Sequence, residues 1–253
     1  MKIAASIQAR VGSTRLPGKV LKEINGKPML LRQVERLRRS RLLDEIIVAT
    51  TTNPDDDKIV ELCINNNIAY YRGSENDVLD RVSSMIKDKN IDIHVECFGD
   101  SPLTDPHIVD EVIGYYYKNQ ADIDFVSNSL KTTYPPGQEV LVYRGSCLIN
   151  ANKLIAKDDP LREHVSINIT QYPNEYRLKN LEAPSYYHYP NIYLEVDTAE
   201  DFEVISSIFA YFDNKGVEHF SLSEILEFLS QNNELMNINN QVDRRWKEFR
   251  END

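Results

Sequence analysis

The chain has 253 residues and a formal net charge of −11, with 29 Lys and Arg against 40 Asp and Glu. This acidic balance disfavours nonspecific binding to nucleic acids or to anionic membrane surfaces. No apolar run approaches the roughly 18 residues of a transmembrane helix, and the first residues lack a secretory pattern. The three cysteines are widely spaced without a Cys-x-x-Cys pair, so we expect no disulfide framework, no zinc site and a reduced, cytoplasmic setting.

The first half of the chain alternates between two hydrophobic periods. Short apolar runs predict strands at 3–8, 45–50, 68–72 and 91–98, and amphipathic stretches predict helices at 28–39, 58–66, 77–87 and 106–117. Strand–helix units in succession are typical of a parallel, doubly wound α/β sheet.

The second half is less regular. Further strands are predicted at 125–128, 139–143, 176–181 and 192–196, and the Asn-rich stretch 231–241 is interpreted as a loop. Capping boxes predict helices that begin after Thr198 and Ser221. Trp246 and Phe249 are three residues apart and would share a helix face. We predict a single domain with three parts, a nucleotide-binding half (1–125), an acceptor and dimer half (126–205) and C-terminal helices (206–253).

One loop, Arg10-Val-Gly-Ser-Thr-Arg-Leu-Pro-Gly-Lys19, directly follows the first predicted strand. It combines glycines, short hydroxyl donors and three cations, which is the composition that a polyphosphate requires. A basic surface turn is the alternative. The position at a strand's carboxyl end favours a phosphate site, although the spacing fits neither a Walker A loop nor a Gly-x-Gly-x-x-Gly turn.

Two aspartates occupy similar places. Asp100 follows the strand at 91–98, and Asp197 follows the strand predicted at 192–196. One or two carboxylates beside a triphosphate are what Mg²⁺ uses in nucleotide sites. The alternative for each aspartate is a turn or helix-capping role.

Five blocks in order over about the first 205 residues resemble a known family. They are Gln8-Ala-Arg-Val-Gly-Ser-Thr-Arg-Leu-Pro-Gly-Lys19, Val48-Ala-Thr-Thr-Thr-Asn-Pro54, Tyr71-Arg-Gly-Ser-Glu-Asn-Asp-Val-Leu-Asp-Arg81, Gly99-Asp-Ser-Pro-Leu-Thr-Asp-Pro106 and Val196-Asp-Thr-Ala-Glu-Asp201. The pattern resembles the cytidylyltransferases that make CMP-sialate and CMP-Kdo, and more closely the branch named for spore coat polysaccharide biosynthesis protein F (SpsF). The resemblance implies a Rossmann-like, GT-A type nucleotide-diphospho-sugar transferase fold with a mixed, mostly parallel sheet. It also implies a small dimerisation insertion and a homodimer.

The resemblance also implies roles for individual residues. The catalytic residues would be Arg10, Arg15, Lys19 and Asp100, and the metal ligands would be Asp100 and Asp197. The nucleotide-binding residues would be Gln8, Ala9, Arg10, Gly12, Ser13, Thr14, Arg15, Lys19 and Arg72. Arg72 would contact the base, with a surface ion pair to Glu75 or Asp77 as the alternative. Phe98 departs from the polar residue that several sialate and Kdo enzymes carry before Gly-Asp.

The predicted acceptor contacts are Asn128, Tyr134, Gly137, Glu139, Arg162 and His164. His164 near its reference pKa would also suit a general base, whereas a helix first turn with a local ion pair is the alternative for the segment 162–164. The partners implied are CTP and an acidic sugar or related acceptor, with Mg²⁺ as cofactor. A GT-A type glycosyltransferase and a nucleotide-binding regulator are the competing functions; a single aspartate in Gly99-Asp-Ser-Pro102, instead of Asp-x-Asp, disfavours the glycosyltransferase.

Overall fold

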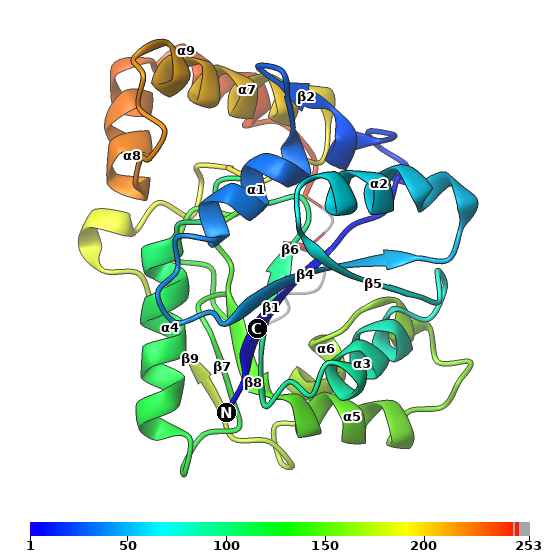
Figure 1. The fold of residues 1–253 in the computed structure, drawn as a ribbon. Coiled ribbons are helices and arrows are strands. Elements are labelled where there is room, and N and C mark those ends of the chain that lie inside the picture. Colours follow the sequence, from blue (N-terminus) through cyan, green and yellow to red (C-terminus); the bar gives the residue numbers. More distant parts are fainter. Residues whose placement is uncertain (245, 248–253) are drawn as a thin grey trace.

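A seven-stranded sheet in the order β5-β4-β1-β6-β8-β7-β9 runs through the molecule (Figure 1). The computed structural model describes residues 1–244 and 246–247. The sheet strands are β1 (Ile3–Gln8), β4 (Glu45–Thr51), β5 (Ala69–Gly73), β6 (Ile93–Phe98), β7 (Phe125–Ser127), β8 (Leu141–Arg144) and β9 (Leu178–Asn180). Strands β5, β4, β1 and β6 are parallel, β8 is antiparallel to both of its neighbours, and β9 is parallel to β7. This confirms the predicted mostly parallel, mixed sheet.

Helices cover both faces of this sheet (Figure 1). One apolar core includes residues of α1 (Met29–Leu37), α2 (Asp57–Asn65), α4 (Pro106–Asn119), α7 (Ala199–Asn214) and α8 (Leu222–Gln231). A second core on the other face includes residues of α3 (Val78–Asp88), α5 (Gly145–Leu154) and α6 (Ile167–Thr170). Burial of each such Leu, Ile or Phe side chain contributes about 1.5–3 kcal/mol.

Strand β1 lies between β4 and β6, which explains why its sequence, Ile-Ala-Ala-Ser-Ile-Gln, is apolar on both faces. From β1 the chain adds β4 and β5 on one side and then β6 on the other. The carboxyl ends of β1 and β6 therefore form the topological switch point, where open α/β sheets bind ligands.

The remaining elements are short. They are β2 (Glu23–Ile24), β3 (Lys27–Pro28), α9 (Asn233–Asn239) and four 3₁₀ turns, η1 (Lys19–Leu21), η2 (Pro54–Asp56), η3 (Pro160–Glu163) and η4 (Ser185–Tyr187). Both predicted capping boxes are present, at Thr198 with Asp201 and at Ser221 with Glu224. None of the helices in the described part of the chain has the length and apolar character needed to span a bilayer.

Two sequence-based predictions of elements were wrong. The stretch 231–241 contains helix α9 instead of a loop. The segment 192–196 is not a strand: Leu194 N donates to Pro136 O at 2.7 Å, and Val196 N donates to Asp100 O at 2.7 Å. Its backbone bonds go to two different loops, so no ladder forms. Phe249 lies outside the described residues, and the homodimer stays a prediction.

Candidate active site

The carboxyl ends of β1 and β6 meet at Gly99. A Cβ at this position would lie 2.1 Å from the carbonyl oxygen of Gln8, so no side chain fits between the two strand ends. The basic loop leaves β1 at this seam, and Asp100 leaves β6 beside it. The lack of a side chain at Gly99 thus brings the predicted phosphate loop and the first predicted metal ligand to one edge of the sheet.

Lys19 reaches both predicted metal ligands. Its Nζ donates to Asp197 Oδ1 at 3.0 Å and to Val196 O at 2.6 Å, and lies 3.6 Å from Asp100 Oδ2. Burial disfavours the charged form of Lys19, but the nearby carboxylates of Asp100 and Asp197 together favour it more strongly. The pKa of Lys19 is therefore raised. The structure brings these three residues together, as the sequence predicts.

The two arginines of the loop differ in their surroundings. Arg15 Nη2 lies 2.5 Å from Asp197 Oδ2, and its Nη1 donates to the carbonyl oxygen of Asp243 at 3.1 Å. Arg10 is exposed and forms no hydrogen bond or ion pair with the described residues. A polyphosphate at this edge would therefore meet one cation that is already paired with Asp197 and one that is available.

The loop is held in place by Asp56, a residue that the sequence analysis missed. Asp56 is buried, and its Oδ1 accepts from Val11 N at 2.7 Å while Oδ2 accepts from the Thr51 hydroxyl. Val11 O in turn accepts from the backbone N–H groups of Ser13 and Gly18 at 2.8 and 2.9 Å. Gly18 has a φ of 67°, which favours glycine. Nothing in the local sequence marks Asp56 as a support for the loop.

The other predicted loop contacts are accessible to different degrees. Gly12 and Thr14 are exposed, whereas Ser13 is partly buried and its Oγ accepts from Leu16 N at 3.4 Å. Ala9 is buried, and its N–H extends the sheet by donating to Ala49 O at 3.2 Å. Their contacts with a nucleotide stay predictions.

Arg81, at the end of one of the sequence blocks, lies close to the loop residue Arg10. It is buried and packs across Gly73, where an added Cβ would lie 2.7 Å from Arg81 Cγ. Burial and the neighbouring Arg10 lower the pKa of Arg81 to about 10, against the opposing effect of Asp56 and Glu75. Arg81 thus adds a second positive charge close to Arg10.

Arg72 has partners other than those considered from the sequence. Its Nε donates to Thr51 O at 2.8 Å, its Nη2 donates to Asn53 O at 3.0 Å, and Nη1 lies 2.7 Å from Asp57 Oδ1. The ion pair is therefore with Asp57, not Glu75 or Asp77. Base contact by Arg72 stays a prediction, and these bonds hold its guanidinium against the connection after β4.

A buried carboxyl group lies beneath the nucleotide edge. Glu96 is 2% exposed on β6, and accepts from Gln8 Nε2 at 3.2 Å and from the Tyr143 hydroxyl at 3.1 Å. Burial raises the pKa of Glu96 to about 7, while hydrogen bonds from Tyr143, Gln8 and Ser166 lower it. The Gln8 side chain is therefore directed towards Glu96 on the neighbouring strand, while its backbone is paired with β4 and β6. Contact of Gln8 with a nucleotide stays a prediction.

Four predicted acceptor residues gather around the segment 128–139. Asn128 is buried and bonds its own chain, donating to Gln138 O and accepting from Val140 N, both at 2.8 Å. Gly137 has a φ of 101°, and a Cβ there would lie 2.5 Å from the Leu194 carbonyl carbon. Its N–H donates to Glu139 Oε2 at 2.8 Å. Asn128, Tyr134 and Glu139 line one small crevice.

Arg162 and His164 are not part of this group. Arg162 is 2% exposed, and its guanidinium donates to Asp77 Oδ2 at 2.8 and 3.0 Å, to Ile155 O at 3.1 Å and to Asn152 Oδ1. These bonds place Arg162 on the α3–α5 side, where it links α3 to the segment 152–155, and its contact with an acceptor stays a prediction. His164 is exposed, directly after η3, so a helix first turn is replaced by a 3₁₀ turn.

The C-terminal segment packs against the Asp197 side of the site. Arg244 is 3% exposed and donates to Asp201 Oδ1 at 2.7 Å and Oδ2 at 3.1 Å. Asp201 Oδ2 also accepts from the backbone N–H groups of Asp197 and Thr198 at 2.9 and 3.0 Å. Arg244 therefore fixes the carboxylate that holds the backbone of Asp197. Sequence reasoning assigned Asp201 only to a capping box and did not identify Arg244.

A further carboxyl group, Glu195, lies beside this segment. Its Oε1 accepts from Trp246 Nε1 at 2.7 Å. Burial raises the pKa of Glu195 to about 8, helped by Glu139 and Asp100 and opposed by Trp246 and Arg244. The acceptor side of the site is thus acidic, in contrast to the basic loop opposite.

The side chains present fit a divalent ion. The described residues contain no cluster of three metal-ligating side chains, but Mg²⁺ in nucleotide sites uses one or two carboxylates with phosphate oxygens and water. Asp100 and Asp197 already share one cation, the Lys19 ammonium. Their oxygens are the hard donors that Mg²⁺ prefers.

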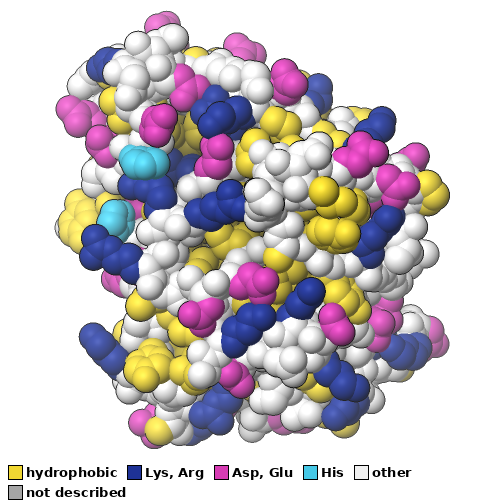
Figure 2. Space-filling view, in the orientation of Figure 1, with side chains coloured by type: hydrophobic (Ala, Val, Ile, Leu, Met, Phe, Trp, Pro, Cys, Tyr) yellow, Lys and Arg dark blue, Asp and Glu magenta, His cyan; other side chains and the backbone are white. Residues whose placement is uncertain are grey.

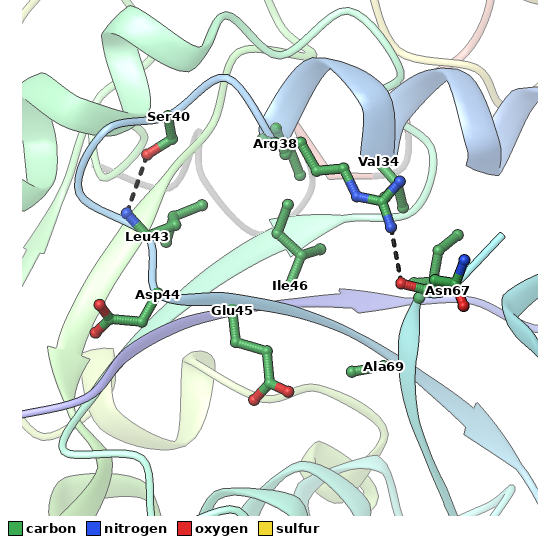
Figure 3. Close-up of a pocket in the computed structure, with 11 residues that line it drawn as sticks. Val34, Arg38, Ser40, Leu43, Asp44, Glu45, Ile46, Asn67 and Ala69 are labelled. Atoms are coloured by element: carbon green, nitrogen blue, oxygen red, sulfur yellow. Dashed lines mark hydrogen bonds between the residues drawn. The ribbon is translucent and has the colours of Figure 1, made fainter.

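A cavity of about 300 Å³ lies at the opposite edge of the sheet (Figure 3). It is lined by the beginnings of β4 and β5 and by the end of α1. The acidic groups that line it are already bonded: Asp44 Oδ2 accepts from Ile3 N at 2.8 Å, and Glu45 pairs with Lys2 at 2.8 Å. It lies at the amino ends of the strands and is not part of the predicted site.

Known proteins are similar to this chain in sequence and architecture. A family model described as cytidylyltransferase matches residues 4–243. The spore coat polysaccharide biosynthesis protein SpsF of Bacillus subtilis is 33% identical over 230 residues, covering 89% of this chain and 93% of that protein. A cytidylyltransferase structure from Leptospira borgpetersenii serovar Hardjo-bovis has a TM-score of 0.88 at 30% identity, covering 97% and 100% of the two chains.

A more distant structure shares the fold. The CMP:2-keto-3-deoxy-manno-octonic acid synthetase complexed with CTP has a TM-score of 0.62 at 20% identity, covering 83% of this chain and 99% of that one. The family model spans almost the whole chain, and the SpsF relative exceeds 30% identity over most of both proteins. The chain therefore belongs to the cytidylyltransferase family and is a CTP-dependent nucleotidyltransferase.

Proposed function

We propose that this enzyme transfers CMP from CTP to an acidic sugar or related acceptor, with Mg²⁺ and release of pyrophosphate, in surface polysaccharide or glycan biosynthesis. The observation that carries the proposal is Lys19, whose ammonium lies between Asp100 and Asp197 at the end of a glycine-containing basic loop. Membership of the cytidylyltransferase family favours this reaction over sugar transfer by a glycosyltransferase.

The reaction is attack by an acceptor oxygen on the α-phosphorus of CTP, and positioning and charge neutralisation supply most of the catalysis. Arg10, Arg15 and Lys19 would hold the β- and γ-phosphates and stabilise the leaving pyrophosphate. Lys19 remains protonated because its pKa is raised. Mg²⁺ on Asp100 and Asp197 would neutralise charge on the phosphate oxygens.

The acceptor is proposed to bind across the segments 128–139 and 192–197, opposite the basic loop. Glu139 and Glu195 are acidic groups on that side, and burial raises the pKa of Glu195 to about 8 with help from Glu139. A protonated carboxyl can donate a hydrogen bond to an anionic acceptor, which an ionised one cannot. The names of the relatives, SpsF and the Kdo synthetase, support a sugar acceptor of this kind.

Pyrophosphate release from CTP, ATP, GTP and UTP with sialate, Kdo and neutral sugars as acceptors tests the reaction. We expect release with CTP and an acidic sugar. The Asp100→Asn variant should lose turnover by at least ~100-fold, because the loss of a group that stabilises transition-state charge costs about that much. Asp158→Asn, which removes the same charge from an exposed position, should retain wild-type turnover. Near-normal activity of Asp100→Asn would refute the metal assignment, and CTP turnover with neutral sugars alone would refute the acceptor class.

A further inference from the structure

A second hollow, of about 610 Å³, lies between α1, the end of α7 and the connection 215–221. We propose that it is a binding site for a small organic anion that carries a phosphate or carboxylate group. It is lined by Asn25, Lys27, Arg32, Glu35, Arg36, Arg38, Arg39, Phe209, Asp213, Gly216, Val217, Glu218, His219 and Phe220. Its volume lies within the roughly 300–1,000 Å³ of small-molecule sites.

Arg36 is the residue that points to a ligand. It is 4% exposed, its guanidinium lies 4.4 Å from the centre of the Phe220 ring, and its Nη2 donates to Leu103 O at 3.3 Å. Its Nε and Nη1 are buried and have no hydrogen-bond partner among the described residues. Buried polar donors are costly when unpaired, and a buried guanidinium especially so. An anion in the hollow would satisfy them.

Two carboxylates near Arg36 accept hydrogen bonds from other groups. Asp105 accepts from His107 N at 2.8 Å and from Leu222 N at 2.6 Å. Glu224 Oε2 accepts from the N–H and hydroxyl of Ser221. They act on Arg36 at longer range, and burial nevertheless lowers the pKa of Arg36 to about 10. Neither carboxylate pairs directly with the guanidinium.

The hollow is positively charged on an acidic protein. Five Lys and Arg line it against three acidic residues, and two of those acids are already bonded, Glu35 to Lys27 at 2.9 Å and Asp213 to Arg32 at 2.6 Å. Arg38 is bonded elsewhere, because its Nη2 donates to Asn66 O at 3.1 Å and to Asn67 O at 2.9 Å. Arg36 and Arg39 are the remaining cations, and the acids nearest to them are Glu218 in the lining and, at longer range, Asp105 and Glu224. Figure 2 shows Lys and Arg side chains interspersed with Asp and Glu, beside a histidine, on the upper left of the molecule near α1 and α8. An anion is thus attracted to this face despite the net charge of −11.

The hollow is separate from the nucleotide edge. Helix α7 begins directly after Asp197 and Thr198, and its far end carries Asp213, which lines the hollow. A helix of 16 residues is about 24 Å long. A ligand here therefore does not contact Lys19 or Asp100, and the inference does not rest on the proposed reaction.

Calorimetric titration of the full chain with citrate and, separately, with inorganic phosphate tests the site. We expect saturable binding of at least one probe; citrate alone identifies a carboxylate ligand, and phosphate alone identifies a phosphorylated one. Arg39→Ala, a partly exposed change, should weaken binding at least tenfold, and Arg36→Gln should do the same if the variant folds. Thermal unfolding of each variant checks the fold.

Two controls locate the bound anion. Arg41→Ala removes the same charge from an exposed position outside the hollow, and Lys19→Met alters the nucleotide edge. Arg41→Ala should leave the affinity unchanged. Lys19→Met removes only the phosphate that binds at the nucleotide edge and should leave in place the binding that Arg39→Ala removes. The proposal is overturned if neither probe saturates, if Arg39→Ala binds normally, if Arg41→Ala weakens binding as much as Arg39→Ala does, or if all binding disappears in Lys19→Met.

Discussion

At the scale of single residues, Lys19 has the most demanding position in the site. It is 12% exposed and serves as counter-ion to two carboxylates, yet it is also the predicted ligand of the pyrophosphate. A phosphate at this edge would therefore compete with Asp100 and Asp197 for the same ammonium. Charge at this position, and not merely a long side chain, is what both roles require.

Lys19→Met tests this directly. We expect pyrophosphate release from CTP to fall at least ~100-fold, because a charge-assisted donor to the leaving group is lost while the length of the side chain is kept. Lys58→Met, on the exposed face of α2, removes the same charge and should leave turnover unchanged. Equal activity in both variants would show that Lys19 is only a structural counter-ion.

The sequence predicted this cation but not its supports. Loop composition is visible in a short window, so Arg10, Arg15 and Lys19 were found without a structure. Asp56 and Arg244 act through contacts across 45 and 43 residues, and no local pattern reveals such pairs. Arg162 was predicted from its charge as an acceptor contact; the fold bonds it to Asp77 and Ile155, and its contact with an acceptor stays a prediction.

At the scale of elements, β6 combines an ordinary buried strand with an ionisable side chain. Glu96 occupies a position between Gln8 on β1 and Tyr143 on β8, with a pKa raised to about 7 by burial. A raised carboxyl pKa means that the folded state holds a proton that the unfolded state has released. The contribution of Glu96 to stability is therefore present at low pH and is lost as the pH rises from about 4.5 to about 7.

Glu96→Gln should remove this pH dependence. The free energy of unfolding of the wild type should fall with pH in that window, relative to the variant, by up to about 1.4 kcal/mol per pH unit. Urea unfolding of both proteins at a series of pH values measures the difference. Parallel pH profiles would mean that Glu96 stays ionised in the folded protein.

The regular elements were predictable because hydrophobic period and length agree in them. Strand β1 and helix α4 show this clearly, with buried residues at the four inner strand positions or on one helix face. The segment 192–196 has the same apolar pattern as a strand, but its N–H groups bond to Pro136 and Asp100. Burial was therefore predicted correctly there, whereas the bonding partners depended on the tertiary fold.

At the scale of the whole molecule, Arg244 in the C-terminal segment stabilises the Asp197 side of the candidate site. Arg244 joins the C-terminal segment to α7 through Asp201 and to Tyr193 by stacking at 4.3 Å. Asp201 is fully buried, and burial opposes its ionisation, but Arg244 contributes to holding its pKa below the usual value. Folding of the last part of the chain and positioning of Asp197 are thus coupled.

Arg244→Met should be strongly destabilising, by about 3–5 kcal/mol, because the carboxylate of Asp201 would remain buried without its cation. It should also lower CTP turnover in the fraction that stays folded. The matched control is Arg177→Met, which breaks a more exposed pair with Asp124 and should cost about 1 kcal/mol or less. Chemical denaturation gives both values, and similar losses for the two variants would contradict the coupling.

The approach of Gln8 O to Gly99 limits how enzymes of this layout can diversify. Because one strand end contacts the other without room for a methyl group, the anion-gripping loop and the aspartate beside it cannot be shifted independently of each other. An engineer who wants a roomier substrate cleft has no freedom at this joint. New specificity must be introduced across from it, by remodelling the turns around residues 128–139 and 192–196.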